Sequence, residues 1–390
     1  MRHRRTAGPW ANDVHIVTDV PSTYRVHLFR ALSRALTERG VGFRVSFLSR
    51  HQRHRVWSEA SGSYGFRHSF GWGPAVYPRD NLPVHINPGV WARTMVDPGT
   101  WLVLGGAWYQ PAVLGSVYCA HPRHMLLWTE NAERMTFSSS SPVERVRRNA
   151  YEHFGGFVVP GTRADDHARS LSGRRSVRLP NTVDESLFRD RVSAMRADRG
   201  AMRAVWNLGE EPVLLWPTRL VRAKGVVPFL EAIRGVTGEF TLLVAGDGVL
   251  ADEVAACILR LGLGDRVRLI GKVSQEQMLE LYTVSDALLL ASLFDPYPLS
   301  TIEALWSGLP LLLSERVGSV PEVLDAGSNG WSFDPSRPER AAEALASLLE
   351  VGRSRLEAMG SRSREIACER FETEHVASRF AEDLLDSFPP

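Results

Sequence analysis

Short apolar runs alternate with amphipathic stretches along the second half of the chain. The pattern predicts strands at 213–216, 241–245, 267–270, 287–290, 311–314 and 331–333. It predicts helices at 226–236, 250–261, 275–284, 299–307 and 320–326. Apolar strands that alternate with amphipathic helices are typical of a parallel sheet covered on both faces. The second half is therefore expected to form a doubly wound α/β domain.

The first half shows the same alternation less clearly. Strands are predicted at 14–18, 41–48, 101–104, 125–128, 157–159 and 176–179, and helices at 24–38 and 142–154. The helix at 24–38 places Leu28, Phe29, Leu32 and Leu36 on one face. Residues 50–98 have weak periodicity, so only loops and short elements are expected there. The pattern therefore predicts that the first half also forms an α/β domain.

A polar, arginine-rich segment at 181–208 separates the two halves, and we place the domain boundary between residues 185 and 186. Two helical stretches, at 338–350 and 353–388, end the chain. Ligands of doubly wound domains bind beyond the carboxyl ends of the strands. Two such domains are expected to face each other across a cleft.

The amino-acid composition argues against several classes of protein. The 390 residues are 44% hydrophobic and 23% charged, as in soluble globular proteins, and no apolar run is long enough to span a membrane. The net charge of +2 gives no case for nucleic-acid binding. The basic N-terminus lacks the apolar core of a secretory signal. Three distant cysteines exclude a disulfide framework, so a cytoplasmic location is expected.

Only two of the 46 basic residues are lysine, Lys224 and Lys272. Lys224 and Arg219 lie in one strand-to-helix connection, where both cations can face one anion near a helix start. Such a loop is often only a solvated basic surface. The rarity of lysine and the glycine that follows Lys224 favour a phosphate site.

The segment 292–310 carries a second candidate. Asp295 ends a strand, Glu303 lies in the first turns of a helix, and the amides of residues 299–301 start that helix. Free amides and the helix dipole favour an anion, and a carboxylate suits paired sugar hydroxyls. Ser300 and Glu303 also have the spacing of a capping box, and Asp295-Pro296 that of a turn, so a purely structural interpretation stays open.

A third candidate is the Gly246-Asp-Gly248 turn after the strand at 241–245. It lacks the third glycine of a dinucleotide fingerprint, and an ordinary tight turn explains it equally well. Lys272 follows Gly271 at the end of the next strand, at the same edge of the predicted sheet.

Together these motifs resemble retaining nucleotide-sugar glycosyltransferases of family 4, glycosyl transferases group 1, which have the GT-B architecture of two Rossmann-like domains. The resemblance rests on segments that occur in the family's order: Leu179–Asp184, Thr218–Gly225, Leu243–Gly248, Val267–Gly271, Ser285-Asp286, Asp295–Glu303, Gly308–Pro310, Gly318–Val323 and Asn329-Gly330. Near the start, Pro21–Phe29 resembles members that lack a glycine-rich first loop.

The resemblance implies roles for individual residues. Arg219 and Lys224 would hold the donor diphosphate, Asp295 would face the transferred sugar, and Glu303 would bind the ribose. The other implied donor-binding residues are Thr218, Gly246, Gly271, Lys272, Val273, Tyr297, Leu299, Ser300 and Thr301. The last helix, 372–390, would pack back on the first domain.

Two departures from the family pattern concern the site. Most relatives have Glu at the position of Asp295 and Gly-Phe-Gly where Pro296-Tyr297-Pro298 stand, and proline has no N–H to donate. Many relatives also have a histidine that faces the sugar at a strand end in the first domain. Here the matching stretch is 126–131, and we expect Glu130 to occupy that place and contact the acceptor, or else to be a surface or helix-start glutamate.

The expected reaction is transfer of a sugar from a nucleotide-diphosphate sugar, with UDP-sugar as the expected donor and retention implied by the family. The acceptor is a hydroxyl or amine of a small molecule, lipid or glycan. No Asp-x-Asp motif occurs, so no metal and no cofactor are expected. Arg219→Ala or Lys224→Ala is expected to abolish transfer and leave the fold intact.

Several alternatives stay open. A sugar phosphorylase or epimerase shares the fold, a nicotinamide oxidoreductase shares the sheet type, and a non-catalytic sugar-nucleotide-binding protein shares the motifs. The helix at 24–38 could rest on a membrane, although an ordinary domain helix is favoured. The low lysine content indicates a GC-rich bacterial genome, in which such enzymes often act on natural products, lipids or polysaccharides.

Overall fold

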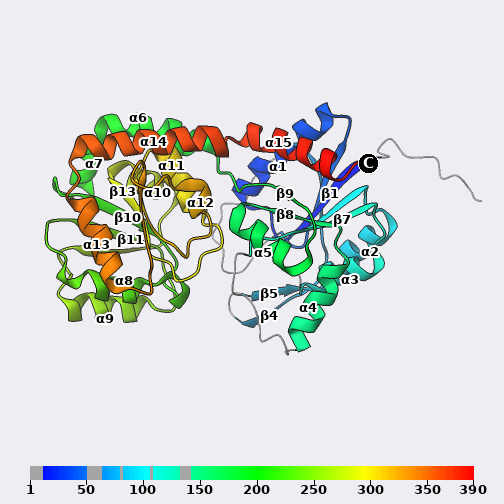
Figure 1. Ribbon diagram of the computed structural model, residues 1–390, viewed down its shortest axis with the longest axis horizontal. Coiled ribbons are helices and arrows are strands. Elements are labelled where there is room, and N and C mark those ends of the chain that lie inside the picture. Colours follow the sequence, from blue (N-terminus) through cyan, green and yellow to red (C-terminus); the bar gives the residue numbers. More distant parts are fainter. Residues whose placement is uncertain (1–11, 51–63, 80–81, 106–108, 132–141) are drawn as a thin grey trace, which may run out of the picture. The chain divides into compact units, whose positions relative to one another are not determined.

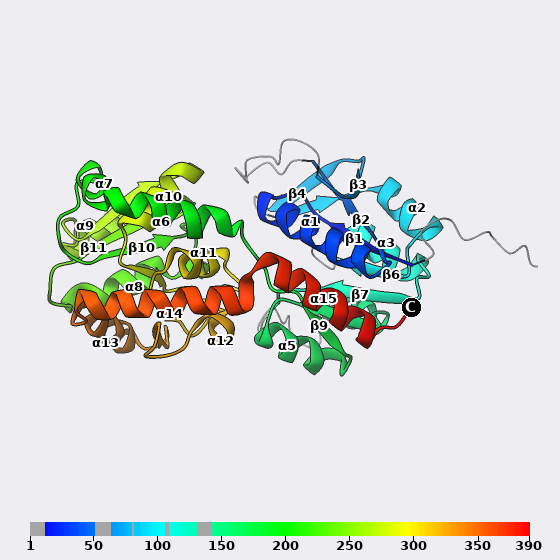
Figure 2. The same ribbon diagram turned by 90° about the horizontal axis from the view of Figure 1, so that it is seen from above.

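The computed structural model describes residues 12–50, 64–79, 82–105, 109–131 and 142–390 (Figures 1 and 2). The chain divides into two compact units. The first unit consists of Met1–Thr182 and Thr373–Pro390, and the second of Val183–Glu372. Each has its own parallel sheet and its own hydrophobic core. Residues 51–63 and 80–81, within the segment for which the sequence predicted only loops and short elements, lie outside the described residues.

The first unit is built on a seven-stranded parallel sheet of order β3-β2-β1-β6-β7-β8-β9. Its strands are β1 (Asp13–Thr18), β2 (Gly42–Phe47), β3 (Arg67–Phe70), β6 (Trp101–Leu104), β7 (His124–Trp128), β8 (Gly156–Val159) and β9 (Ser176–Arg178). Its helices are α1 (Thr23–Glu38), α2 (Pro88–Val96), α3 (Pro111–Cys119), α4 (Pro142–Glu152), α5 (Thr162–Ser172) and α15 (Thr373–Ser387). A separate antiparallel hairpin pairs β4 (Ala75–Arg79) with β5 (Leu82–His85).

Helices cover both faces of this sheet. One apolar cluster joins the strands to α1 and α15, and a second joins them to α3, α4 and α5. Leu28, Phe29, Leu32 and Leu36, the predicted apolar face of α1, are fully buried. Figures 1 and 2 both show α15 beside α1, so the last helix completes the first unit. The apolar face of α1 is therefore occupied within the protein's own core.

The second unit is built on a six-stranded parallel sheet of order β12-β11-β10-β13-β14-β15. Its strands are β10 (Val213–Pro217), β11 (Thr241–Ala245), β12 (Val267–Gly271), β13 (Ala287–Leu290), β14 (Leu311–Ser314) and β15 (Gly330–Phe333). Its main helices are α8 (Val226–Ala232), α9 (Ala251–Leu261), α10 (Gln275–Val284), α11 (Leu299–Ser307), α12 (Val320–Val323), α13 (Pro338–Leu349) and α14 (Arg353–Phe371).

The segment that the sequence marked as an interdomain candidate is mostly helical. It contains the π-helical η1 (Ser186–Arg191), α6 (Val192–Met195), the 3-10 turn η2 (Arg196–Asp198) and α7 (Arg199–Val205). Arg199 and Arg203 both pair with Asp286, whose carboxylate also accepts the Val213 N–H at 2.9 Å. Asp286, a residue of the family motif, therefore fastens α7 to the start of β10.

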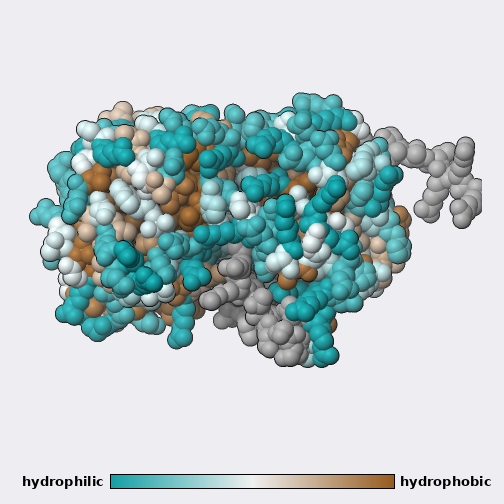
Figure 3. All heavy atoms as spheres, viewed as in Figure 1, coloured by the Kyte–Doolittle hydropathy of each residue, from teal (hydrophilic) through white to brown (hydrophobic). Residues whose placement is uncertain are grey.

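No described helix combines the length and the apolar character that crossing a bilayer requires. Figure 3 shows hydrophilic side chains spread over the visible face of both units, with smaller apolar areas between them. Of the large apolar side chains that are exposed, Trp91, Met95 and Val96 lie together on α2, while others, such as Val205 and Val249, are scattered.

Candidate functional site

The strand order of the second unit reverses between β10 and β13, which pair as neighbours. Doubly wound sheets bind ligands at such a switch point, beyond the carboxyl ends of the strands. Arg219 and Lys224 lie in the connection after β10, and Asp295 lies in the connection after β13. The topology therefore brings these predicted residues to one edge of the sheet.

Backbone contacts fasten the two connections to each other. The N–H groups of Leu293 and Phe294 both donate to the Ala223 carbonyl, at 2.9 and 3.0 Å. Gly225 follows with φ +66°, and a Cβ there would lie 2.5 Å from the Ala291 carbonyl oxygen. Only glycine fits this left-handed conformation and close approach. The position of Lys224 is therefore fixed by its neighbours on both sides.

Lys224 Nζ forms an ion pair with Asp295 Oδ2. Both side chains are largely buried, with exposed fractions of 15% and 10%. The Asp295 carbonyl in turn accepts the Gly318 N–H at 2.8 Å, and a Cβ on Gly318 would lie 1.8 Å from the Pro296 carbonyl oxygen. Gly318, a residue of the family motif, thus lets the connection after β14 pack against Asp295.

Arg219 differs from Lys224 in its surroundings. Its side chain is exposed, and no ion pair or side-chain hydrogen bond engages it within the described part of the chain. The guanidinium therefore keeps its charge and its donors available to an anion in solution.

Glycines at the ends of β11 and β12 complete the same edge. A Cβ on Gly246, which has φ +141°, would lie 1.8 Å from the Thr218 carbonyl oxygen. The Gly246 N–H donates to the Gly271 carbonyl at 2.8 Å. Lys272 is exposed and lies 3.8 Å from Asp247, a pairing that contributes little in water, and Val273 is partly buried against the core. Thr218, Gly246, Gly271 and Lys272 thus form one continuous rim.

The capping-box interpretation of Ser300 and Glu303 is wrong. Helix α11 begins at Leu299 with Pro298 as its N-cap, and no side chain caps it. Ser300 therefore lies inside the first turn, where it cannot act as the cap. Thr301 donates through both its N–H and its hydroxyl to the Pro298 carbonyl. The amides of Leu299 and Ser300 have no acceptor within the described part of the chain.

Glu303 is held by a residue that the sequence did not single out. Tyr282 Oη, from α10, donates to Glu303 Oε2 at 2.7 Å. Burial raises the pKa of Glu303, and the hydrogen bond from Tyr282 partly opposes this rise. Burial and the neighbouring carboxylate also raise the pKa of Tyr282. The pair therefore presents a partly buried carboxyl group near the start of α11.

Two predicted residues lie elsewhere. The side chain of Tyr297 is 5% exposed and belongs to the apolar core of the second unit. Glu130 lies in the first unit, after β7, where it pairs with Arg25 at 3.5 Å and accepts a hydrogen bond from Asn181 at 3.0 Å. Glu130 is thus a partnered residue at a strand end, not an isolated surface glutamate.

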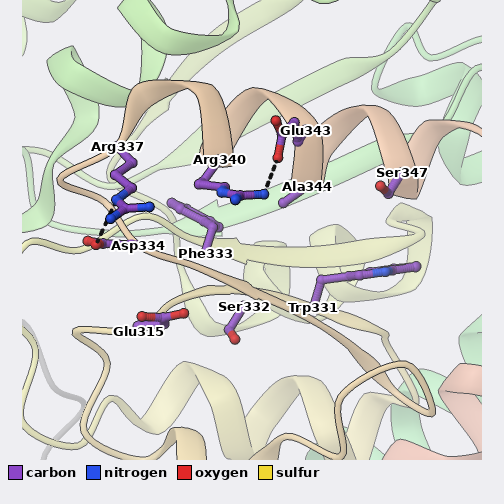
Figure 4. Close-up of a pocket in the computed structure, with 10 residues that line it drawn as sticks. All are labelled: Glu315, Trp331, Ser332, Phe333, Asp334, Arg337, Arg340, Glu343, Ala344 and Ser347. Carbon is purple, nitrogen blue, oxygen red and sulfur yellow. Dashed lines mark hydrogen bonds and ion pairs between the residues drawn. The ribbon is translucent and has the colours of Figure 1, made fainter.

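A surface hollow in the second unit is lined by none of the predicted site residues (Figure 4). It lies between the ends of β14 and β15 and helix α13. Four of its five charged side chains form two ion pairs, Arg340 with Glu343 at 2.8 Å and Arg337 with Asp334 at 4.0 Å. Within the described residues, no group of three or more His, Cys, Asp or Glu side chains is placed to hold a metal ion.

Comparison with known proteins identifies the family of the second unit. Its residues 198–366 match the family model described as glycosyl transferases, group 1. Residues 198–366 form a group 1 glycosyltransferase domain. The resemblance drawn from the motifs is confirmed at this level.

The curated relatives that the chain matches are distant. It is 28% identical over 206 residues to N-acetyl-alpha-D-glucosaminyl L-malate synthase of Bacillus anthracis, covering 51% of each chain. It is 25% identical over 211 residues to alpha-D-kanosaminyltransferase of Streptomyces kanamyceticus, covering 53% of this chain and 54% of that one. The chain thus spans about half the length of the curated relatives it matches.

The fold is similar to solved structures over nearly the whole chain. Anabaena HepE, solved in complex with UDP and glucose, matches 96% of this chain and 100% of its own with a TM-score of 0.74, at 16% identity. This similarity and the two parallel sheets confirm the predicted GT-B fold of two Rossmann-like domains.

Proposed function

We propose that this chain transfers a sugar from a nucleotide-diphosphate sugar to a hydroxyl or amine of an acceptor, with retention and without a metal. The observation that carries the proposal is the meeting of Lys224 and Asp295 at the switch point of the group 1 domain. A cation, a carboxylate and the free amides of α11 then stand at one sheet edge. HepE, of the same fold, was solved with UDP, so a uridine nucleotide is the first donor to test.

The chemistry explains why these groups are needed. Breaking the bond to the anomeric carbon leaves negative charge on the diphosphate and positive charge on the sugar ring. Arg219, Lys224 and the amides of Leu299 and Ser300 stabilise the diphosphate, while Asp295 lies beside the sugar. Removal of one preorganised donor of this kind typically lowers the rate about a hundred- to a thousandfold. Glu303 accepts the donor ribose hydroxyls.

The ion pair also determines how the contacts of Lys224 and Asp295 change when the donor binds. In the structure Asp295 neutralises Lys224, so an arriving diphosphate competes with Asp295 for the ammonium group. The diphosphate of a nucleotide sugar carries about two negative charges and Asp295 only one, so the diphosphate attracts the ammonium group more strongly at a similar distance. Donor binding thus turns Lys224 towards phosphate and frees Asp295 to face the sugar.

The test begins with the thermal shift of the full chain in the presence of UDP-, GDP- and dTDP-sugars, because a bound donor raises the melting temperature. Arg219→Ala is then compared with Arg222→Ala, an exposed arginine of the same connection that has no role in the proposal. Arg219→Ala should lose about a hundredfold in transfer, and Arg222→Ala should stay near wild type. Product analysis separates transfer from phosphorolysis and epimerisation. Wild-type turnover of Arg219→Ala would refute the proposal.

A further inference from the structure

A polar cluster lies at the carboxyl edge of the first unit's sheet. Arg25, in the first turn of α1, donates to Thr18 Oγ1 at 2.6 Å and to Tyr24 Oη at 3.1 Å. Its guanidinium lies over the ring of Trp128, 4.6 Å from the ring centre, and pairs with Glu130. The strand order of this sheet reverses at β1, so the cluster occupies the position at which doubly wound sheets bind ligands.

Several members of the cluster are buried with an unpaired atom. Asn181, which is 2% exposed, donates through Nδ2 to Glu130, and its Oδ1 has no partner among the described residues. Trp128 Nε1 and Asp19 Oδ1 are likewise buried and unpaired there. A buried unsatisfied polar group costs about 1–3 kcal/mol, so a bound molecule that supplies partners for these three atoms stabilises the site.

The charges of the cluster do not suit an anion. Burial alone would lower the pKa of the Arg25 guanidinium, but Tyr24, Glu130 and Asp19 around it raise it. One cation thus faces two carboxylates, and its donors are engaged by Thr18, Tyr24 and Glu130. Of the three open atoms, those on Asp19 and Asn181 are acceptors, and Trp128 Nε1 is a donor that a neutral hydroxyl oxygen can satisfy.

We propose that Asp19, Arg25, Trp128, Glu130 and Asn181 form the acceptor site and select a polyhydroxylated acceptor that is neutral or carries a protonated amine, over one that carries phosphate or carboxylate. Hydroxyl and ammonium groups donate to the open acceptor atoms, and the net negative charge repels an anion. This inference rests on the proposed function, because only a transfer reaction makes the bound molecule an acceptor. The binding preference itself requires only the first unit.

Three hexoses that differ mainly in charge test the preference: glucosamine, glucose and glucose 6-phosphate. Each is titrated into the full chain at mildly acidic pH, without nucleotide sugar, and binding is followed by saturation-transfer NMR or calorimetry. Glucosamine should bind most tightly and glucose 6-phosphate most weakly. Tighter binding of glucose 6-phosphate, or no saturable binding of either of the other two, overturns the inference.

Two variants locate the effect. Asp19→Asn should lower the affinity for glucosamine about tenfold with much less effect on glucose, because it removes one charge and keeps the shape. Asp166→Asn, an exposed aspartate of α5, is the matched control and should change neither. Asn181→Ala should weaken both sugars alike, because it removes an acceptor of hydroxyl groups. An unchanged ratio of glucosamine to glucose affinity in Asp19→Asn contradicts the inference.

These titrations contain no donor, so they are independent of the donor site. If donor sugars fail to bind while the hexose preference holds, the proposed function fails and the cluster remains a sugar site. If donors bind normally and glucose 6-phosphate is preferred, only the acceptor inference fails.

Discussion

The ion pair between Lys224 and Asp295 gives both side chains a part in stability as well as in the proposed chemistry. Each is largely buried, so neither charge is well solvated when the other is removed. Breaking such a pair by removing one partner leaves an uncompensated buried charge, which costs about 3–5 kcal/mol. The exposed Arg219 carries no such penalty.

Lys224→Ala is therefore expected to lower the free energy of unfolding of the second unit by about 3 kcal/mol, and Arg219→Ala by less than about 0.5 kcal/mol. The sequence predicts an intact fold for both variants and does not show this difference in stability, because the partner of Lys224 lies 71 residues away. Urea denaturation of the two variants measures the difference. Equal stabilities would show that the pair contributes nothing.

Glu303 and Tyr282 form the second pair that matters at this scale. Because the hydrogen bond from Tyr282 lowers the pKa of Glu303 while burial raises it, Tyr282→Phe should raise that pKa further. A ribose contact needs the ionised carboxylate, so donor affinity falls as the pH drops through the pKa. The midpoint of this loss should move to higher pH in Tyr282→Phe.

Donor dissociation constants between about pH 5 and pH 8 measure this shift. Glu303→Gln is the control, since its affinity should be lower and should not follow the same titration. A midpoint that stays in place after Tyr282→Phe would mean that Glu303 does not bind the donor in its ionised form.

At the scale of elements, the donor edge depends on close backbone approaches between consecutive connections. The connection after β11 lies so close to that after β10 that a Cβ on Gly246 would lie 1.8 Å from the Thr218 carbonyl oxygen. Gly246→Ala should therefore displace the segment that carries Arg219, strain the backbone by about 1–3 kcal/mol and weaken donor binding.

Gly235→Ala is the matched control, because a Cβ there meets no atom within 4 Å. It should keep both stability and donor affinity. Calorimetric unfolding and donor titration of the two variants measure the contrast. Donor affinity that survives Gly246→Ala would show that the rim does not position the site.

Strand–helix alternation predicts the second unit well because its buried strands are short apolar runs between strongly periodic helices. The prediction fails where hydrogen bonds from a side chain determine the local backbone conformation. A helix was predicted at 320–326, but α12 ends at Val323. The buried Asn329 accepts the Asp325 N–H at 2.7 Å and donates to the Val323 carbonyl at 3.0 Å, which holds this segment as a turn.

In the first unit, β3, β4, β5 and α2 lie in the segment for which only loops and short elements were expected, and the helices α3 and α5 were not predicted. The candidate site shows the same limit. Arg219, Lys224, Asp295 and Glu303 stand out by type and position, but Tyr282 and Asp19 become informative only when the fold shows their neighbours. Sequence motifs thus predict which edge of the sheet carries the site, but the side chains that contact the motif residues are identified only from the three-dimensional structure.

At the scale of the whole molecule, two units with separate cores are expected to unfold in separable steps. The last helix, α15, is expected to unfold together with the first unit. Phe380, Leu384 and Phe388 pack into the first unit's core, and Trp101 Nε1 donates to the Phe388 carbonyl at 2.7 Å. The unfolding transition of the first unit therefore includes both the N-terminal part of the chain and its C-terminal helix.

Acid should weaken the first unit through His15, in the buried strand β1. Burial and the nearby Arg44 lower its pKa to about 3, while the unfolded chain titrates near the ordinary value of about 6.5. Below that value the unfolded state binds a proton that the folded state refuses, so stability falls as the pH drops from about 6.5 towards 3. At about 1.4 kcal/mol per pH unit, His15 by itself lowers the free energy of unfolding of the first unit by about 2 kcal/mol at pH 5.

Glu303 acts in the opposite direction in the second unit. Its folded-state pKa is raised, so the folded state binds the extra proton and stability rises as the pH falls through that pKa. The two unfolding steps should therefore move in opposite directions on mild acidification. His15→Asn should flatten the pH dependence of the first unit's step, and His153→Asn, at an exposed histidine, should leave it unchanged. Calorimetric scans from pH 7.5 to pH 5 (about two and a half units) measure both steps, and an equal slope in His15→Asn and the wild type would show that His15 is not the titrating group.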